Sequence, residues 1–293
     1  MKKLVSVVLM IASVSAVASQ EKTKIIYGED DRKEVIDEKN PMIRSLSKSV
    51  AVMVKRNSIQ PMKYNWMKKI IKSSTLKETV NTCTGERFAD QTAPGYCTGF
   101  LVGDKYLVTA GHCIADSTDC AKYKWVFDFK VGNKKSGLKG DEITVKKSAI
   151  YGCKKVITTS QGKYDHALIE LDKKVKDRRA LKVRTSGKPT VGTELFVIGH
   201  PMGLPMKVAG GAEVRRYRHS TKFMTNLDTY GGNSGSPVFN AHDGVVEGIL
   251  VDGDRDFNTT WRGCRKSNMV SNSLANEGVS TIGQIQNLKY YTK

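Results

Sequence analysis

The sequence has no apolar run long enough to cross a bilayer, so we predict no transmembrane segment. Its early apolar stretch, Leu4–Val14, follows the positive residues Lys2 and Lys3 and is too short to span a membrane. The small residues Ala16-Val17-Ala18 come next, and no cysteine directly follows them that could take a lipid. These features are typical of a secretory signal peptide over residues 1–18. We therefore expect a secreted or periplasmic protein.

Metal-ligand spacings are missing as well. The chain contains six cysteines and five histidines, but they form no Cys-x-x-Cys or His-x-x-x-His pattern. Zinc sites usually show such spacings, so we predict neither a metal site nor a cofactor. An even number of cysteines in an exported chain indicates disulfide bonds instead, because the compartments outside the cytoplasm are oxidising.

Acidic residues are scarce relative to basic ones. The chain has 48 lysines and arginines against 29 aspartates and glutamates, a formal net charge of +19, or +17 once Lys2 and Lys3 leave with the signal peptide. A basic surface can attract nucleic acid, anionic lipid or acidic polymers. The sequence has no basic motif interleaved with aromatic residues. We therefore predict no specific nucleic-acid partner and attribute the charge to solubility and weak adhesion.

What the sequence does contain is a glycine-rich segment around one serine, Leu227–Pro237. A serine hydroxyl is a weak nucleophile that needs a neighbouring base and donors for the oxyanion formed during attack. Ser234 lies in Gly232-Asn233-Ser234-Gly235, where the glycines permit a tight backbone. The N–H groups of Gly232 and Ser234 would then form an oxyanion hole. On its own, such a segment is more often a surface turn than a nucleophile.

Two further segments supply the partners that a serine nucleophile needs. His112 follows the apolar run that begins at Leu107, where a strand would deliver it to a cleft, and Asp165 precedes the apolar run Ala167–Leu171. The order His112, Asp165, Ser234 is one of three chain orders in which the Ser-His-Asp geometry arises, with separations of 53 and 69 residues (165 − 112 and 234 − 165). The combination predicts a nucleophile at 234, a general base at 112 and an orienting acid at 165.

These motifs resemble those of the trypsin-like (chymotrypsin-fold) serine proteases, most of all the bacterial secreted branch that includes staphylococcal V8 and other glutamyl endopeptidases. Thr109–Cys113 matches the histidine motif of that family, and Gly231–Pro237 matches its serine motif, with Asn233 where animal trypsins have an aspartate. Ile26–Arg32 resembles the start of the mature chain in this branch. The resemblance implies two six-stranded antiparallel β-barrels with the active site between them. It also implies a disulfide beside the catalytic histidine, between Cys97 and Cys113.

Short apolar strands recur along the chain with few helices between them, which indicates an all-β sandwich or barrel. A charged link near residue 175 divides the strands. We expect an N-terminal β-barrel in residues 25–175 and a C-terminal β-barrel in residues 176–293, preceded by a pro-segment at 19–24. The expected strands lie at 50–54, 98–102, 106–109, 125–129, 143–145, 155–158, 167–171, 194–198, 206–209, 222–225, 236–239 and 245–251.

Two segments are expected to be helical. The apolar residues of the lysine-rich stretch Lys55–Glu78 have a partly helical spacing, which predicts an amphipathic surface helix near residues 64–73. Such a helix could lie on a membrane surface, but we favour a solvated insertion packed on the barrel. The apolar residues Ile282, Ile285 and Leu288 predict a closing C-terminal helix.

Four cysteines remain once Cys97 and Cys113 are paired, and they allow three connectivities. We favour Cys120–Cys153, because both residues lie near expected strands of the first half of the chain. That choice leaves the last pair by remainder, Cys83–Cys264.

Substrate specificity is where the chain departs from glutamyl endopeptidases. Asp228 lies six residues before the nucleophile, at the base of the S1 pocket in the related trypsins, and Leu250 replaces the histidine that lines the pocket in the glutamyl enzymes. A carboxylate in a dry pocket favours a cation and repels glutamate. We therefore predict cleavage after Arg or Lys, with Thr229 and Gly253 also binding substrate. Alternatively, Asp228 pairs with a nearby cation and the pocket is shaped differently. Further acids close by could support cationic substrates or merely decorate a loop: Asp252, Asp254 and Asp256.

Three alternatives to an Arg/Lys-specific endopeptidase stay open. They are a glutamyl-type endopeptidase, an inactive protease-like binding module, and an esterase with the same triad. The last is disfavoured because the chain lacks a Gly-x-Ser-x-Gly elbow. Two other residues could be mistaken for triad members: Asp172 follows its strand rather than leading it, and His166 points to the face opposite its neighbour Asp165. We expect a monomer whose partners are protein or peptide substrates.

Overall fold

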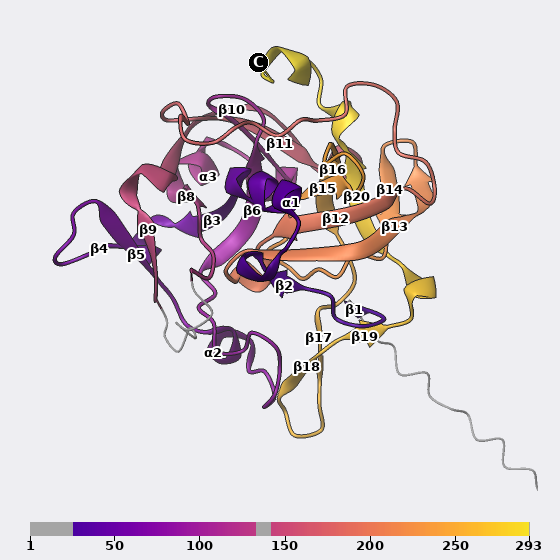
Figure 1. Cartoon of the computed structure of the whole chain (residues 1–293), viewed down its shortest axis with the longest axis horizontal. Helices are drawn as coiled ribbons and strands as arrows, with labels where there is room; N and C mark the ends of the chain where they lie inside the picture. Colours follow the sequence, from indigo (N-terminus) through magenta and orange to yellow (C-terminus); the bar gives the residue numbers. More distant parts are fainter. Residues whose placement is uncertain (1–25, 133–141, 293) are drawn as a thin grey trace, which may run out of the picture.

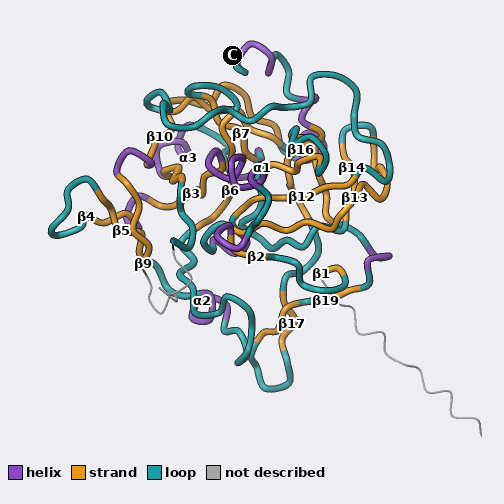
Figure 2. Tube along the Cα trace, viewed as in Figure 1, coloured by secondary structure: helices purple, strands orange, loops and turns teal. Residues whose placement is uncertain are grey.

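The computed structural model describes residues 26–132 and 142–292, and β-strand is the predominant regular structure in this part of the chain. Figure 2 shows strands and loops making up most of it, with only short helices between them. The predicted signal peptide and pro-segment lie outside the described residues.

Six strands close the first barrel, and each is hydrogen-bonded to antiparallel neighbours in the order β10-β11-β7-β6-β3-β8. The barrel strand that comes first along the chain, β3, has an uninterrupted apolar run at residues 50–54. Ala51 and Met53 face the main core, whereas Val52 and Val54 face a second apolar cluster on the outside of the barrel, so both faces are buried. The strands are β3 (Val50–Lys55), β6 (Gly95–Leu101), β7 (Tyr106–Thr109), β8 (Tyr123–Phe127), β10 (Ile150–Ser160) and β11 (His166–Leu171).

Six further strands close the second barrel, in the order β12-β15-β16-β20-β14-β13, and the β12–β13 pairing completes the ring. All of these pairings are antiparallel, which confirms the predicted all-β fold of two six-stranded antiparallel barrels. Figure 1 shows the two barrels side by side, the first in magenta and the second in orange and yellow. The strands are β12 (Glu194–Gly199), β13 (Lys207–His219), β14 (Lys222–Thr225), β15 (Pro237–Asn240), β16 (Val246–Asp252) and β20 (Glu277–Thr281).

The segment that precedes the first barrel lies against the second barrel. The short strand β1 (Ile26–Tyr27) pairs in parallel with β19 (Met269–Val270), and β2 (Lys33–Glu34) adds to the edge of β13. The chain therefore crosses from the second barrel to the first before β3 begins. The division near residue 175 falls in the connection between β11 and β12, and it stays a prediction.

The expected helix near residues 64–73 is wrong. This segment contains a turn and the strand β5 (Lys68–Lys72), which lies between β4 (Ile59–Pro61) and β9 (Glu142–Lys146) in a three-stranded sheet. The strand forms because Ile71 pairs with Ile143 and is buried with it against the outer apolar cluster of the first barrel. Strand pairing overrides the partly helical spacing.

The described helices are short. The α-helices are α1 (Pro41–Leu46), α2 (Leu76–Val80) and α3 (Ser117–Lys122). The expected C-terminal helix takes the form of two 3₁₀ turns, Ile282–Gln284 and Leu288–Tyr290. A last hairpin of β17 (Phe257–Thr259) and β18 (Arg265–Ser267) extends from the second barrel.

Three disulfides connect the described cysteines in the pattern favoured from the sequence: Cys97–Cys113, Cys120–Cys153 and Cys83–Cys264. The first joins β6 to the turn after β7, and the second joins α3 to β10. The third bridges residues 181 apart in the sequence and links the end of α2 to the hairpin of the second barrel. It therefore ties together segments from the two halves of the chain.

Candidate active site

His112 and Asp165 meet because their strands are neighbours. His112 lies in a 3₁₀ turn just after β7, and Asp165 immediately precedes β11, the antiparallel partner of β7. The distance from His112 Nδ1 to Asp165 Oδ2 is 2.7 Å, and the backbone N–H of His112 donates to Asp165 Oδ1 at 3.1 Å. Because a carboxylate can only accept, Nδ1 carries the proton and Nε2 faces away as an acceptor. Asp165 thus holds His112 by two hydrogen bonds, one to the imidazole and one to the backbone.

Ser234 lies in the turn between β14 and β15, and its backbone is bound to the first barrel. The N–H of Thr98 on β6 donates to the carbonyl of Ser234 at 2.8 Å, and the Thr98 hydroxyl donates to the carbonyl of Gly232 at 2.9 Å. The sulfur of Cys113, the residue after His112, lies 3.7 Å from the same Ser234 carbonyl. The serine turn is therefore seated beside the histidine turn.

The three predicted triad members are not all joined by hydrogen bonds. Among the described residues, His112 is bonded to Asp165, whereas no hydrogen bond joins the hydroxyl of Ser234 to His112. Serine–histidine bonds are often long or poorly aligned when no substrate is bound, and they tighten in the reacting complex. The structure thus pairs the acid with the base and places the serine turn next to them.

The backbone of the serine turn leaves two N–H groups without partners. The N–H groups of Gly231, Asn233 and Gly235 all donate hydrogen bonds, to Asp256, Tyr230 and Leu250 respectively. Those of Gly232 and Ser234 have no acceptor within the part of the chain that the structure describes. Gly232 has φ +87° and Gly235 has φ +89°, a left-handed backbone that favours glycine. Two neighbouring free donors are what an oxyanion hole requires.

A cavity of about 210 Å³ opens beside Ser234. The predicted substrate-binding residues Thr229, Leu250 and Gly253 lie along it. No lysine or arginine lines this cavity among the described residues. Its acidic lining residues are Asp252, Asp254, Asp256 and Glu277.

Glu277 is the most deeply buried of these acids and was missed by the sequence analysis. It begins β20, its exposed fraction is 2%, and its Oε2 accepts a hydrogen bond from the hydroxyl of Thr229 at 2.6 Å. Its other oxygen, Oε1, has no partner in the described structure. Burial, reinforced by the nearby acids, raises the pKa of Glu277 well above its usual range. A β-carbon at Gly253 would lie 2.2 Å from Oε1, so only glycine leaves room for this carboxyl group.

The other acids of the cavity have partners. Asp252 forms an ion pair with Lys222, and Asp254 accepts from the side-chain amide of Asn276 at 3.0 Å. Asp256 accepts from the N–H of Gly231 at 2.9 Å, and burial raises its pKa to about 6. Among the described acids of the cavity, the buried oxygen without a partner belongs to Glu277.

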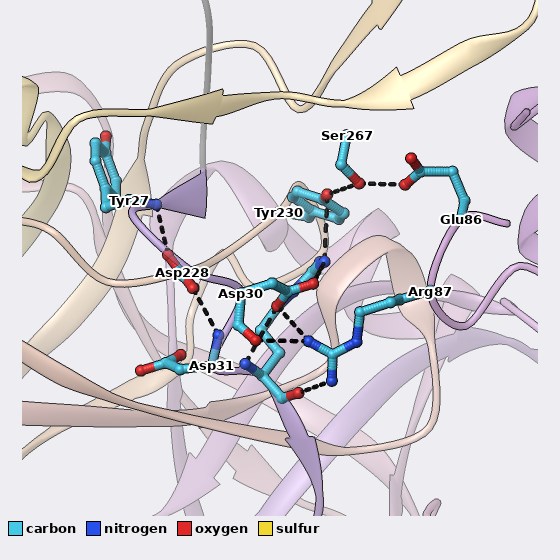
Figure 3. Close-up of polar contacts among 9 residues, drawn as sticks. Tyr27, Asp30, Asp31, Glu86, Arg87, Asp228, Tyr230 and Ser267 are labelled. Carbon is cyan, nitrogen blue, oxygen red and sulfur yellow. Dashed lines mark hydrogen bonds and ion pairs between the residues drawn. The ribbon is translucent and has the colours of Figure 1, made fainter.

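The structure corrects the predicted role of Asp228. Its carboxylate does not line the cavity beside Ser234. As Figure 3 shows, it points to the N-terminal segment, where Oδ1 accepts from the N–H of Tyr27 at 2.7 Å and Oδ2 from the N–H of Asp31 at 3.0 Å. The alternative of a pairing cation is also not what the structure shows, because both direct partners are backbone groups. No signal in the sequence around Asp228 distinguishes an anchor of this kind from a pocket floor.

The N-terminal segment is fixed by further contacts around Arg32. This buried guanidinium donates to Asp30 at 2.7 Å and lies 4.0 Å from the ring centre of Tyr230. Arg87 reaches the same Asp30 carboxylate at 2.9 Å (Figure 3). Arg87 and Tyr230, which are far apart in the sequence, therefore hold this segment next to Asp228.

Two residues that could be mistaken for triad members lie outside the site. His166 is buried in β11, its Nδ1 has no described partner, and burial lowers its pKa. Asp172 lies 3.8 Å from the ammonium of Lys124. Neither contacts His112 or Ser234 in the described structure.

One group of residues among those described has the spacing of metal ligands, namely Cys97, His112 and Cys113. Both sulfurs belong to a disulfide. A disulfide sulfur is not a thiolate, so this group does not have the donors that zinc requires. None of the helices in the described residues is long and apolar enough to cross a bilayer.

Known proteins resemble this chain in sequence and in fold. Residues 97–249, slightly more than half of the chain, match the family described as the trypsin-like peptidase domain. The chain is 29% identical over 154 residues to a glutamyl endopeptidase of Bacillus licheniformis, covering 50% of this chain and 45% of the relative. It is 26% identical over 191 residues to an extracellular metalloprotease of Bacillus subtilis, covering 61% and 56%. The chain thus spans about half the length of the curated relatives it matches.

A solved structure shows the same fold. The VesB protease of Vibrio cholerae superposes with a TM-score of 0.50 at 16% identity, covering 89% of this chain and 65% of that one. At this identity the likeness concerns the arrangement of the strands.

Proposed function

Because this chain belongs to the trypsin-like peptidase domain family, we propose that it is a secreted serine endopeptidase that cleaves after Arg or Lys. One observation carries the catalytic part. The bonded pair of His112 and Asp165 lies beside a serine turn that presents the free N–H groups of Gly232 and Ser234. Base, nucleophile and oxyanion donors therefore converge from the two barrels.

The proposed reaction is acyl transfer. The hydroxyl oxygen of Ser234 attacks the scissile carbonyl, and Nε2 of His112 takes its proton. The oxyanion receives hydrogen bonds from the two free N–H groups of the serine turn. Asp165 stabilises the imidazolium through Nδ1, and His112 then protonates the leaving amine. A water molecule, deprotonated by the same imidazole, hydrolyses the acyl-enzyme and restores Ser234.

The preference for a basic residue is supported by the cavity beside Ser234. Four carboxyl groups line it, and no described cation does. A cationic side chain entering this space would meet the partnerless Oε1 of Glu277 and lower the pKa of that carboxyl group, whereas a glutamate would meet only further carboxyl groups. The acidic lining of the cavity therefore supports the predicted Arg/Lys specificity, although it does not include Asp228.

A second candidate is a glutamate-specific endopeptidase, which the likeness to the Bacillus licheniformis enzyme favours. A panel of peptides that differ only at the residue before the scissile bond separates the two. We expect Arg and Lys peptides to be cleaved at least about 100-fold faster than the Glu peptide, the discrimination that a few kcal/mol in a desolvated pocket provides. A preference for Glu would contradict the Arg/Lys proposal.

A third candidate is an inactive protease-like binding module. An organophosphonate that phosphonylates activated serines distinguishes it from an enzyme. Stoichiometric labelling at Ser234 is expected, and no labelling of the folded protein would favour the binding module.

A further inference from the structure

The hairpin of β4 and β5 projects from the first barrel and presents an unusual surface. Figure 1 shows it as the outermost feature on that side of the molecule. Its inner face is explained by packing, because Ile71 of β5 is buried against the barrel together with Ile143 and Val145 of the neighbouring strand β9. Its tip, the turn over residues 62–67, is not.

Three large apolar side chains lie exposed in that turn. The exposed fractions are 87% for Tyr64, 77% for Trp66 and 60% for Met67. The turn is ordered by its own bonds, since Asn65 Oδ1 accepts from the N–H of Met67 at 3.1 Å and the carbonyl of Met67 accepts from the N–H of Lys147 at 2.7 Å. Single exposed apolar residues are common, but three within four positions of one turn form a patch of the kind that marks an interaction site.

Lysines surround this patch at close quarters. Lys68 on β5 and Lys146 on β9 are direct cross-strand partners. Like charges that face each other across two strands destabilise a sheet. The stability of the sheet therefore does not explain why both positions are lysine. Lys147 and Lys173 join them around a cavity of about 640 Å³ that Trp66 also lines.

No carboxylate compensates these lysines. None lines the cavity, and no ion pair involves any of the four among the described residues. The nearest acid with a described interaction is Asp177, whose pKa is lowered mainly by its hydrogen bonds with Arg178. Lys146 adds only a weaker attraction at longer range. The sequence also has no acid between Lys55 and Lys77. The surface therefore combines a local excess of positive charge with exposed apolar groups.

We propose that this hairpin tip, with Trp66 and Met67 at its centre and Lys68, Lys146 and Lys147 around it, docks on a bilayer surface containing anionic phospholipid. Tryptophan and methionine would enter the interface between headgroups and acyl chains, while the ammonium groups contact lipid phosphates. A purely polar polyanion would satisfy the lysines and leave the apolar tip in water, so a lipid surface fits both features. The inference is independent of the proteolytic activity.

Vesicle binding tests this proposal on the full mature chain. Vesicles of phosphatidylcholine with about one third phosphatidylglycerol should bind the protein in a sedimentation assay, and pure phosphatidylcholine should bind it much less. Replacing Lys68 and Lys146 together by glutamine should weaken binding about 25-fold, since each lysine near an anionic surface contributes about 5-fold. The double variant Trp66→Ala with Met67→Ser should weaken binding by at least about 10-fold.

A matched control comes from the other exposed tryptophan. Trp261, 88% exposed on the β17–β18 hairpin and stacked with Arg262, offers the same residue types elsewhere. Trp261→Ala should bind vesicles as the unmodified protein does, and all variants should keep their cleavage rate on a short peptide. Equal losses in the Trp66→Ala, Met67→Ser double variant and in Trp261→Ala, or equal binding to neutral and anionic vesicles, would overturn the proposal.

Tryptophan fluorescence gives an independent readout. The chain has three tryptophans. Trp125 is buried, so in a Trp261→Phe background Trp66 is the exposed one. Anionic vesicles should shift its emission to shorter wavelength. If short DNA binds these lysines and vesicles cause no shift in the Trp66 emission, the surface binds nucleic acid and the lipid proposal is wrong.

Discussion

At the scale of single residues, the site depends on one carboxyl group that composition and motif did not reveal. Glu277 projects from β20 into a cavity beside the serine turn, and one of its oxygens has no partner. The sequence contains the signal only weakly, as the one charged residue of the short strand β20 (Glu277–Thr281). By contrast, His112 and Asp165 follow directly from their motifs, because each stands at the end of an apolar strand.

Removing the Glu277 carboxyl group should alter specificity. In the Glu277→Gln variant we expect kcat/KM for Arg and Lys peptides to fall about 10- to 100-fold, since a bound cation lowers the pKa of a neighbouring carboxyl group and ionises it, whereas an amide stays neutral. Peptides with a neutral residue at that position should change little. Asp254→Asn is the matched control, because Asp254 lies on the same cavity but is exposed and bound to Asn276. Unchanged Arg and Lys cleavage in Glu277→Gln would contradict the assignment.

The raised pKa of Glu277 predicts a pH effect on stability with a definite sign. In the folded state this group keeps its proton to a higher pH than in the unfolded state, where it titrates near about 4.3. Above that pH the native state binds more protons, so stability falls as pH rises toward the folded pKa. Glu277→Gln removes this penalty, and its melting temperature should gain on that of the unmodified protein as the pH rises above about 4.3, the pKa of the unfolded state. Thermal denaturation of both in a Ser234→Ala background measures the difference, and parallel pH profiles would refute it.

At the scale of elements, the strands were predictable and their partners were not. The run 50–54 was expected as a strand and is one, with Val52 and Val54 buried on the outer side. The β4–β5 hairpin was missed because its partner strand β9 is 74 residues further along the chain (142 − 68). Local spacing does not report a pairing at that distance.

The N-terminal segment gives the element-scale prediction. Asp228 accepts two backbone hydrogen bonds from residues 27 and 31 and is buried. Asp228→Ala should therefore lower the free energy of unfolding by about 2–3 kcal/mol, because two buried N–H donors lose their acceptor. It should also expose residues 26–34 to added protease.

The two roles of Asp228 predict different substrate profiles. If Asp228 acts as an anchor, the folded Asp228→Ala variant keeps its ranking of Arg and Lys over other residues. Loss of that ranking in a variant with an unchanged melting temperature would show that Asp228 reads the substrate after all.

At the scale of the whole molecule, the two barrels are joined by covalent and polar links. Thr98 on the first barrel binds the serine turn of the second, and the Cys83–Cys264 disulfide connects segments 181 residues apart. The resemblance to a family predicted the barrels and their cleft. It did not predict that the segment before β3 would lie on the second barrel and donate two hydrogen bonds to the carboxylate of Asp228.

The free energy of unfolding lost on removing a disulfide should increase with the number of residues between its two cysteines. Replacing Cys83 and Cys264 by serine should cost about 1.5 kcal/mol more unfolding free energy than the same change at Cys120 and Cys153, whose separation is 33 residues. Urea denaturation of the two double variants measures this difference. A larger loss for the shorter loop would mean that the long-range link adds little to the stability of the fold.

The proposed catalysis depends on Ser234 as a nucleophile and on His112 as its general base. Turnover of an arginine peptide by Ser234→Ala, compared with Ser186→Ala at an exposed loop serine, tests this directly. We expect Ser234→Ala to lose at least about 10⁴-fold in kcat while keeping its melting temperature, and Ser186→Ala to retain full activity. Hydrolysis that survives in Ser234→Ala at the rate of the unmodified protein would contradict the account.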